Sequence, residues 1–172
     1  MKLKSIFKEE LTWQSPLDKE EIIQILYSIV TSESPNFFKS NLVDSSFKYR
    51  GTIEPERFTI QRIINYQNSF LPTIKGEIYP HNQGSLIKMT IQPNIGVQIF
   101  MTLWFLGVTI AMLGAGFAFF TIEQDGHTQY IGLIFPLLML AFGSLLYFLG
   151  FKLEANRSKD DLKFYFKAKD RL

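Results

Sequence analysis

The sequence predicts an α+β domain that is followed by a transmembrane helical hairpin and a short C-terminal helix. Three patterns predict this fold class: helically spaced apolar residues in residues 16–31, period-two alternation in residues 47–91, and two uncharged apolar runs in residues 97–120 and 131–151. They divide the chain into a domain of residues 1–96, a hairpin of residues 97–151 and a tail of residues 152–172.

The two apolar runs are long enough to cross a bilayer. They hold 24 and 21 residues without a charged side chain, and at 1.5 Å per residue they extend roughly 36 and 31 Å. Only a helix or a closed barrel crosses lipid with its backbone groups satisfied. We therefore expect two spanning helices joined by an outer loop of residues 121–130.

The charge distribution predicts the orientation of the hairpin. The loop of residues 121–130 has no lysine or arginine, whereas the tail of residues 152–172 has seven. By the positive-inside rule, both termini lie in the cytoplasm and the loop lies outside. Residues 1–12 lack the apolar stretch of a signal peptide, so we expect the first domain to stay on the cytoplasmic side.

One helix is predicted near the amino terminus, in residues 16–31. Ser15 is its expected cap, Pro16 is tolerated at the first helical position, and Asp18 is in place for a capping box. The apolar residues behind this start recur at helical spacing on one face: Ile22, Ile23, Leu26, Ile29 and Val30.

The alternating stretches predict a four-stranded antiparallel meander with this helix packed on its apolar face. Turn-forming residues separate the stretches. A one-residue slip would turn a strand over, so the register is testable. The expected cross-strand pairs are Ile53 with Phe58, Tyr66 with Phe70, and Ile78 with Ile87.

Two features of the apolar face are candidates for ligand binding. In this register Gly51 and Gly76 flank Ile60 and form a trough, which either holds a ligand or lets the helix approach closely. Arg62 interrupts an apolar row beside Tyr49. It either binds an anion or stacks on the tyrosine with its charged head in water or paired to an acid.

The hairpin contains small residues of the kind that let helices approach in lipid. Two uses remain open: packing the two spans together, and forming a homo-oligomer. The candidates are Gly107, Ala111, Gly114, Ala115 and Ala118 in the first span, and Ala141 and Ser144 in the second.

The tail is basic and aromatic, and it follows the second span directly. It is expected to be a short helix, although Leu162, Phe164 and Phe166 also alternate as in a strand. Two positions are open for it: against anionic lipid at the membrane surface, or docked on the sheet. The basic candidates for the membrane surface are Lys152, Arg157, Lys159, Lys163, Lys167 and Lys169.

Several classes of chemistry are disfavoured. The chain has no cysteine, and its two histidines lack acidic or thiol neighbours at metal-ligand spacing, so we expect no metal and no cofactor. No phosphate loop or nucleophile elbow is present, which makes an enzyme the weaker class. A net charge of +2 argues against nucleic acid as a partner.

Residues 66–78, which read Tyr-Gln-Asn-Ser-Phe-Leu-Pro-Thr-Ile-Lys-Gly-Glu-Ile, resemble a stretch of uncharacterised small bacterial membrane proteins. In that group a cytosolic β domain precedes a two-helix transmembrane anchor. The resemblance covers residues 47–151, with Gln67 where arginine is expected. It implies this architecture and a bacterial inner membrane, and it implies no activity.

The functional expectation is a non-enzymatic, membrane-anchored interaction or ligand-sensing module whose cytosolic domain binds a protein or small ligand near the bilayer. The alternative is an oligomeric channel-forming or membrane-perturbing effector, since small residues recur in the spans. The expected partners are the lipid bilayer and either another protein or further copies of the chain.

Overall fold

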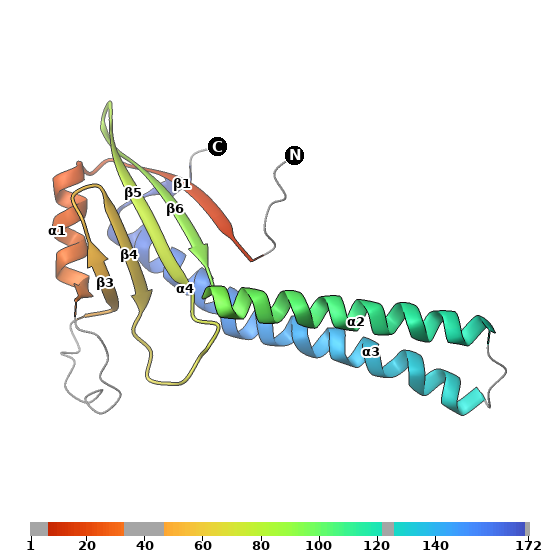
Figure 1. Ribbon diagram of the computed structural model, residues 1–172. Coiled ribbons are helices and arrows are strands. Elements are labelled where there is room, and N and C mark those ends of the chain that lie inside the picture. Colours follow the sequence, from red (N-terminus) through yellow and green to blue (C-terminus); the bar gives the residue numbers. More distant parts are fainter. Residues whose placement is uncertain (1–6, 33–46, 122–125, 171–172) are drawn as a thin grey trace.

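The structure is a computed structural model that describes residues 7–32, 47–121 and 126–170 (Figure 1). Its helices are α1 (Lys19–Ile29), α2 (Ile95–Thr121), α3 (Gly126–Tyr147) and α4 (Leu153–Tyr165), with a π-helical turn η2 (Phe148–Lys152) between the last two. Its strands are β1 (Glu9–Ser15), β2 (Val30–Thr31), β3 (Tyr49–Ile53), β4 (Arg57–Arg62), β5 (Thr73–His81), β6 (Gly84–Gln92) and β7 (Lys169–Asp170).

The strands form one mixed sheet in the order β2-β3-β4-β5-β6-β1-β7. The predicted α+β class is confirmed, but the sheet has seven strands instead of four. The meander of β3 to β6 lies at its centre. Parallel β2 and antiparallel β1 extend it on its two sides, and β7 pairs with the far edge of β1.

The register was predicted correctly at two of the three turns. Ile53 pairs with Phe58, and Ile78 pairs with Ile87. The predicted pair of Tyr66 with Phe70 is wrong, because β4 ends at Arg62 and residues 63–72 form a loop. Ile60 therefore pairs with Ile74 and Phe58 with Gly76. This is a shift of two residues, which leaves every side chain on its predicted face.

The amino-terminal helix is shorter than predicted and has a different cap. Asp18 is the N-cap and accepts from the amide of Glu21, whose carboxylate accepts from the amide of Asp18. This reciprocal pair is a capping box one turn beyond the predicted one. Ser15 instead ends β1, and its hydroxyl donates to the Phe166 carbonyl at 2.5 Å.

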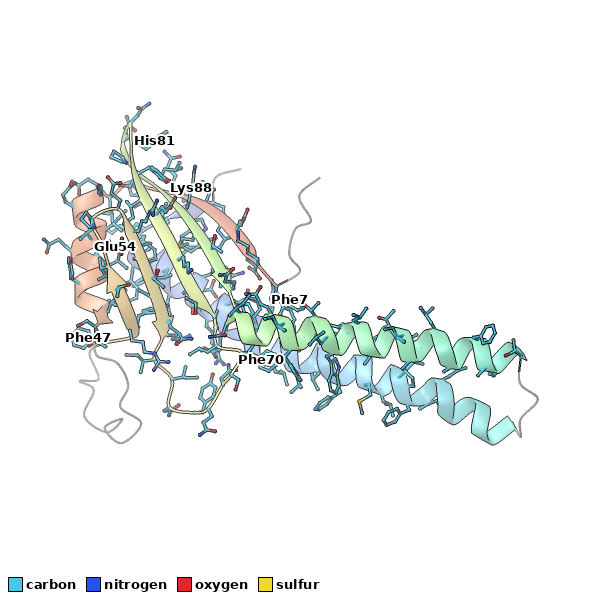
Figure 2. The ribbon with its side chains drawn as sticks, viewed as in Figure 1. Phe7, Phe47, Glu54, Phe70, His81 and Lys88 are labelled. Carbon is cyan, nitrogen blue, oxygen red and sulfur yellow. The ribbon has the colours of Figure 1, made fainter. Side chains whose placement is uncertain are left out.

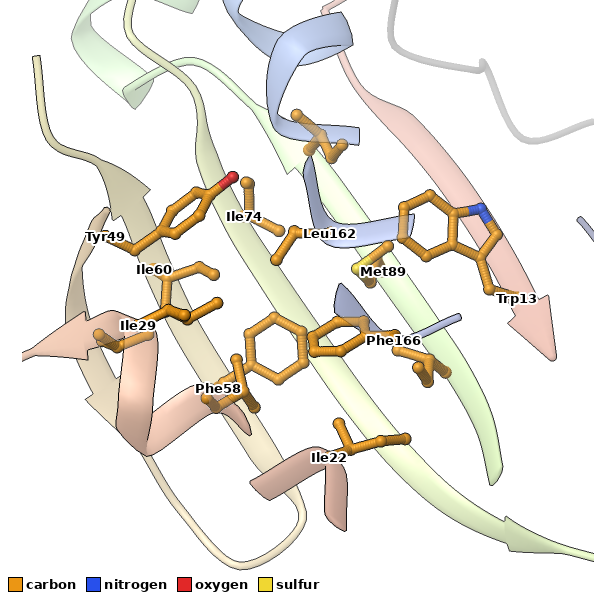
Figure 3. Close-up of a cluster of buried hydrophobic side chains, with 14 of the residues drawn as sticks. Trp13, Ile22, Ile29, Tyr49, Phe58, Ile60, Ile74, Met89, Leu162 and Phe166 are labelled. Carbon is orange, nitrogen blue, oxygen red and sulfur yellow. The ribbon is translucent and has the colours of Figure 1, made fainter. Parts of the chain in front are cut away.

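Two helices cover one face of the sheet and share its core (Figures 1 and 3). Helix α1 supplies Ile22, Leu26 and Ile29, as the apolar stripe predicted. The second helix, α4, comes from the tail. Its buried side chains pack among those of the central strands, and Phe166 just beyond its end meets Phe58 edge-to-face with ring centroids 6.3 Å apart.

The tail therefore belongs to the domain. Of the two positions left open for it, the structure has the docked one, and it is helical over Leu153–Tyr165. Phe151, the last residue of the second apolar run, is also fully buried in the domain core. The boundary between residues 151 and 152 thus lies inside one structural unit.

In the described part of the chain, two helices are long and apolar enough to cross a membrane, and they run side by side away from the domain (Figure 1). The first is separated from β6 by only two residues. The second is continuous from Gly132 through η2 to Tyr165, a length of 34 residues. Of the expected outer loop, residues 122–125 lie outside the described part of the chain, and α3 begins at Gly126.

Candidate functional site

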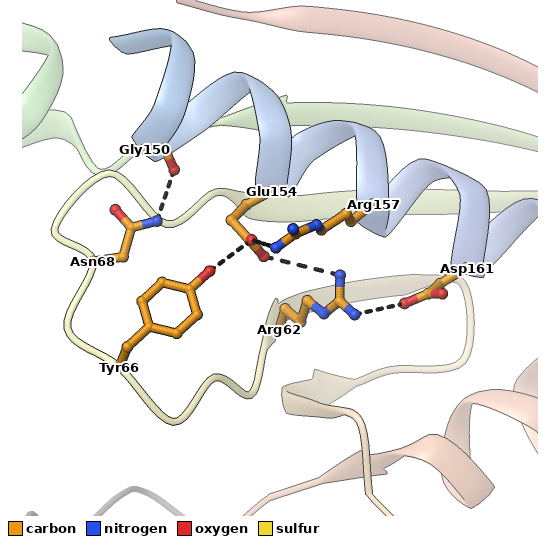
Figure 4. A network of polar contacts seen from close by, with 7 residues as sticks. All are labelled: Arg62, Tyr66, Asn68, Gly150, Glu154, Arg157 and Asp161. Carbon is orange, nitrogen blue, oxygen red and sulfur yellow. Dashed lines mark hydrogen bonds and ion pairs between the residues drawn. The ribbon is translucent and has the colours of Figure 1, made fainter. Parts of the chain in front are cut away.

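The clearest concentration of polar chemistry lies where the second apolar helix enters the domain (Figure 4). It joins the loop of residues 63–72, the end of β4 and the first turns of α4. We call these residues the junction network: Arg62, Tyr66, Asn68, Gly150, Glu154, Arg157 and Asp161.

Glu154 is the centre of this network. It is 2% exposed, an unusual degree of burial for a carboxylate. Tyr66 donates its hydroxyl hydrogen to one carboxylate oxygen at 2.6 Å, and Arg157 donates to the same oxygen at 2.7 Å. The bond to Glu154 and partial burial raise the pKa of the Tyr66 hydroxyl, which keeps it a donor.

Arg62 is held between two acids on α4. Its guanidinium lies 3.9 Å from Glu154 and 3.4 Å from Asp161, which are about two turns apart on the helix. Tyr49 faces it across the β3–β4 ladder, as predicted, and is fully buried. Of the two uses proposed for this arginine, the structure shows the charge paired to acids.

The same loop contacts the π-helical turn. The Asn68 side-chain amide donates to the Gly150 carbonyl at 2.7 Å, and the Asn68 carbonyl oxygen accepts from the amide of Phe70. The Phe70 side chain lies directly on Gly150, where a Cβ atom would come within 2.8 Å of the Phe70 Cβ and within 2.9 Å of its ring. In Figure 2, Phe7 and Phe70 both lie near the end of the domain from which α2 and α3 extend.

The predicted trough is occupied by protein. Gly51 pairs with Ile60, but Gly76 pairs with Phe58, whose ring lies over it. Gly51 has a φ of +153°, and a side chain there would collide with the Thr59 carbonyl of β4. The glycines therefore allow close packing within the sheet, which agrees with the non-ligand alternative.

The tail's basic residues are mostly paired with acids of the domain. Lys152 and Lys159 both contact Glu9 on β1, Lys163 contacts Asp170, and Arg157 contacts Glu154. Lys167 has a φ of +48° just after α4, and Lys169 lies in β7. Because α4 leads away from the apolar helices, Lys163 lies roughly 16 Å further from them than Lys152.

We expect the Glu9 cluster to make stability depend on pH. Partial burial raises the pKa of Glu9, but hydrogen bonds from Lys152 and Lys159 outweigh it, and the net pKa is below the usual 4.5. A lowered folded-state pKa stabilises the fold above the unfolded-state pKa, and this contribution is lost as the pH falls through the lower value.

Glu9→Gln should therefore cost about 1 kcal/mol at neutral pH and leave stability less dependent on pH below about 5. Chemical unfolding in detergent, followed by tryptophan fluorescence, measures both. Equal pH profiles for the two proteins would contradict the pairing.

The contact between the two apolar helices is built around Trp104. Its indole N–H donates to the Met139 carbonyl at 3.3 Å, and its ring lies against Gly143, where a Cβ would approach Nε1 to 2.6 Å. Gly107 and Gly114, by contrast, have no atom within 4 Å of a Cβ position apart from the neighbouring backbone of their own helix. Ala111, Ala141 and Ser144 are also exposed, and Ala115 and Ala118 are half-buried.

Comparison with known proteins adds no family assignment. No family model, curated protein or solved structure matches the chain. The site is therefore interpreted from its geometry alone.

Sequence reasoning found part of the junction. It selected Arg62 and Tyr49, and it raised an acid as one possible partner for the arginine. It missed Glu154, Tyr66 and Asn68. A signal for Glu154 was present, because an acid three residues after the end of an uncharged apolar run needs partners if the helix continues into a core.

Proposed function

We propose that the chain is a non-enzymatic, membrane-anchored interaction or ligand-sensing module of the bacterial inner membrane. In this proposal the hairpin crosses the bilayer, and the domain and both termini lie in the cytoplasm. The charge bias between the tail and residues 121–130 supports this orientation, as does the resemblance to small bacterial membrane proteins.

The observation that carries the proposal is the continuity of α3 with α4. A domain on a flexible linker would be insensitive to its anchor. Here the second apolar helix continues as a core helix of the domain, and the loop of residues 63–72 holds it through Asn68 and Tyr66. A tilt or rotation of the hairpin therefore moves the domain core, and binding to the domain acts back on the hairpin.

The outer face of the sheet is the surface proposed for a partner. Helices α1 and α4 cover one face, and no helix of the described residues covers the other. That face carries rows of threonine, glutamine, lysine and glutamate. It has an open hollow of about 290 Å³ beside the Arg57–Glu77 ion pair, with Thr59 and Lys75 in its lining. An open, polar hollow suits a protein better than an apolar small molecule.

Photo-crosslinking from this face tests the proposal. A photoreactive residue at Thr59 or Lys88 should capture a stoichiometric partner in membranes, whereas one at Gln24 on the exposed side of α1 should not. A thermal-shift screen of the purified chain covers small ligands. Failure of both crosslinking positions together with a flat screen would reject the module proposal.

The second candidate is an oligomeric channel-forming or membrane-perturbing effector. It is favoured by the glycines of α2 that the hairpin leaves unpacked, since Gly107 and Gly114 lie open on the outside of the helix pair. Neither span carries a charged residue, which fits poorly with ion or proton pathways.

A matched pair of substitutions separates self-association from hairpin packing. Gly143→Val should disrupt the hairpin by pushing Trp104 away, and Gly107→Val should leave the hairpin intact while breaking any oligomer. The measurements are the mass of the detergent-solubilised protein and dye release from liposomes. A monomeric parent protein that releases no dye would reject this candidate.

A further inference from the structure

The π-helical turn η2 occurs where one helix has two different partners. Before the turn, α3 packs on α2 through a face that includes Pro136 and Gly143. After the turn, α4 packs on the sheet through Ala155, Ser158 and Leu162, with Phe151 in the turn itself on the same stripe. Two residues separate the end of β6 from the start of α2, so the sheet and α2 are neighbours where this helix passes from one to the other (Figure 1).

In a regular α-helix, the stripe of α3 that packs on α2 and the stripe of α4 that packs on the sheet would point in different directions. Each residue turns the helix by about 100°, so Pro136 and Gly143 point within about 20° of each other. Measured from Gly143, residues 151, 155, 158 and 162 would point about 80°, 120°, 60° and 100° away. A regular helix that kept Gly143 on Trp104 would turn the buried stripe of α4 about a quarter of a turn off the sheet.

The π-helical turn removes this mismatch. A turn closed by i→i+5 hydrogen bonds holds one residue more than an α-turn, and here the amide of Leu153 donates to the carbonyl of Phe148. With one residue discounted, the same four positions lie at about −20°, 20°, −40° and 0° from Gly143. One face of the helix then meets both α2 and the sheet.

We propose that η2 is a phase adaptor, a one-residue insertion that lets a single continuous helix pack both on the first apolar helix, α2, and on the domain core. Two residues of the loop 63–72 hold the adaptor in place. Asn68 donates a hydrogen bond to the Gly150 carbonyl, and the Phe70 side chain packs on Gly150. The adaptor makes the hairpin and the domain turn together about the helix axis. This coupling between hairpin and domain does not depend on which partner the domain binds.

Two single-residue deletions in the full chain test the adaptor. Leu149 in the turn and Asn156 in α4 are both exposed, so each deletion removes one residue and little buried surface. Deleting Leu149 should convert η2 to an α-turn and preserve both stripes. Deleting Asn156 should leave η2 in place and turn Ser158 and Leu162 about 100° out of the core.

The measurement is thermal unfolding of both variants and the parent protein in the same detergent. We expect the Leu149 deletion to keep a cooperative transition within about 5 °C of the parent Tm, and the Asn156 deletion to lose it. Equal tolerance of both deletions would overturn the proposal, because phase would then be immaterial. Loss of the transition in the Leu149 variant would also overturn it.

Discussion

Replacing Phe166 with alanine is expected to lower the free energy of unfolding by about 3–5 kcal/mol, whereas the same change at Phe164 should alter it by less than about 0.5 kcal/mol. The two rings are two residues apart in a segment that sequence alone left open between lipid and sheet. Phe166 is fully buried against Phe58, and Phe164 is 80% exposed.

Chemical unfolding of the detergent-solubilised chain measures both values. Because both variants lose the same aromatic side chain, general effects of hydrophobicity cancel. Similar losses at the two positions would mean that the tail is not docked as the structure shows, and a larger loss at Phe164 would contradict it outright.

Removing the buried carboxylate of the junction network is the second large effect. Glu154→Ala should cost about 3 kcal/mol, because it leaves Arg62 with Asp161 as its remaining acidic partner and removes the acceptor of Tyr66. Asp160→Ala, which removes an exposed acid from the same helix, should cost less than about 0.5 kcal/mol.

A double variant distinguishes lost pairing from lost packing. Replacing both members of a buried ion pair with apolar residues relieves the unpaired charge. The variant with Arg62→Met and Glu154→Leu should therefore be more stable than Glu154→Leu alone. Strict additivity of the two changes would show that the residues are not coupled.

The parts of the fold that sequence predicted are those with local periodicity. Helix α1 and the two long apolar helices have patterns longer than two turns, and the pairs at Ile53–Phe58 and Ile78–Ile87 are fixed by short turns. The β4–β5 register failed because a ten-residue connection sets no register of its own.

The missed elements depend on contacts between distant parts of the chain. In β1, Leu11, Trp13 and Ser15 alternate with polar residues, but nothing local indicates that this strand pairs with β6, about 75 residues later in the chain. The tail was ambiguous for the same reason. Its apolar stripe fits a lipid surface as well as a sheet. The tail docks on the sheet because α1 leaves part of the apolar face uncovered, and this is known only from the folded structure.

The candidate site, too, was predicted only where a local sequence pattern indicated it. Arg62 stood out because it interrupts an apolar row, whereas its acidic partners come from α4, about 90 residues away in the sequence. The π-helical turn begins inside an uncharged run and ends one residue beyond it, at Lys152. The quarter-turn mismatch between the stripes before and after it becomes visible only once both partners of the helix are known.

A distance measurement between spin labels tests the continuity of α3 and α4 most directly. The chain has no cysteine, so Ser144→Cys and Phe164→Cys place two labels at exposed sites on either side of η2. A continuous helix predicts one narrow distance of about 30 Å. A tail that turned after Phe151 to lie along the membrane would give about 22 Å, and that result, or a broad distribution, would contradict the account.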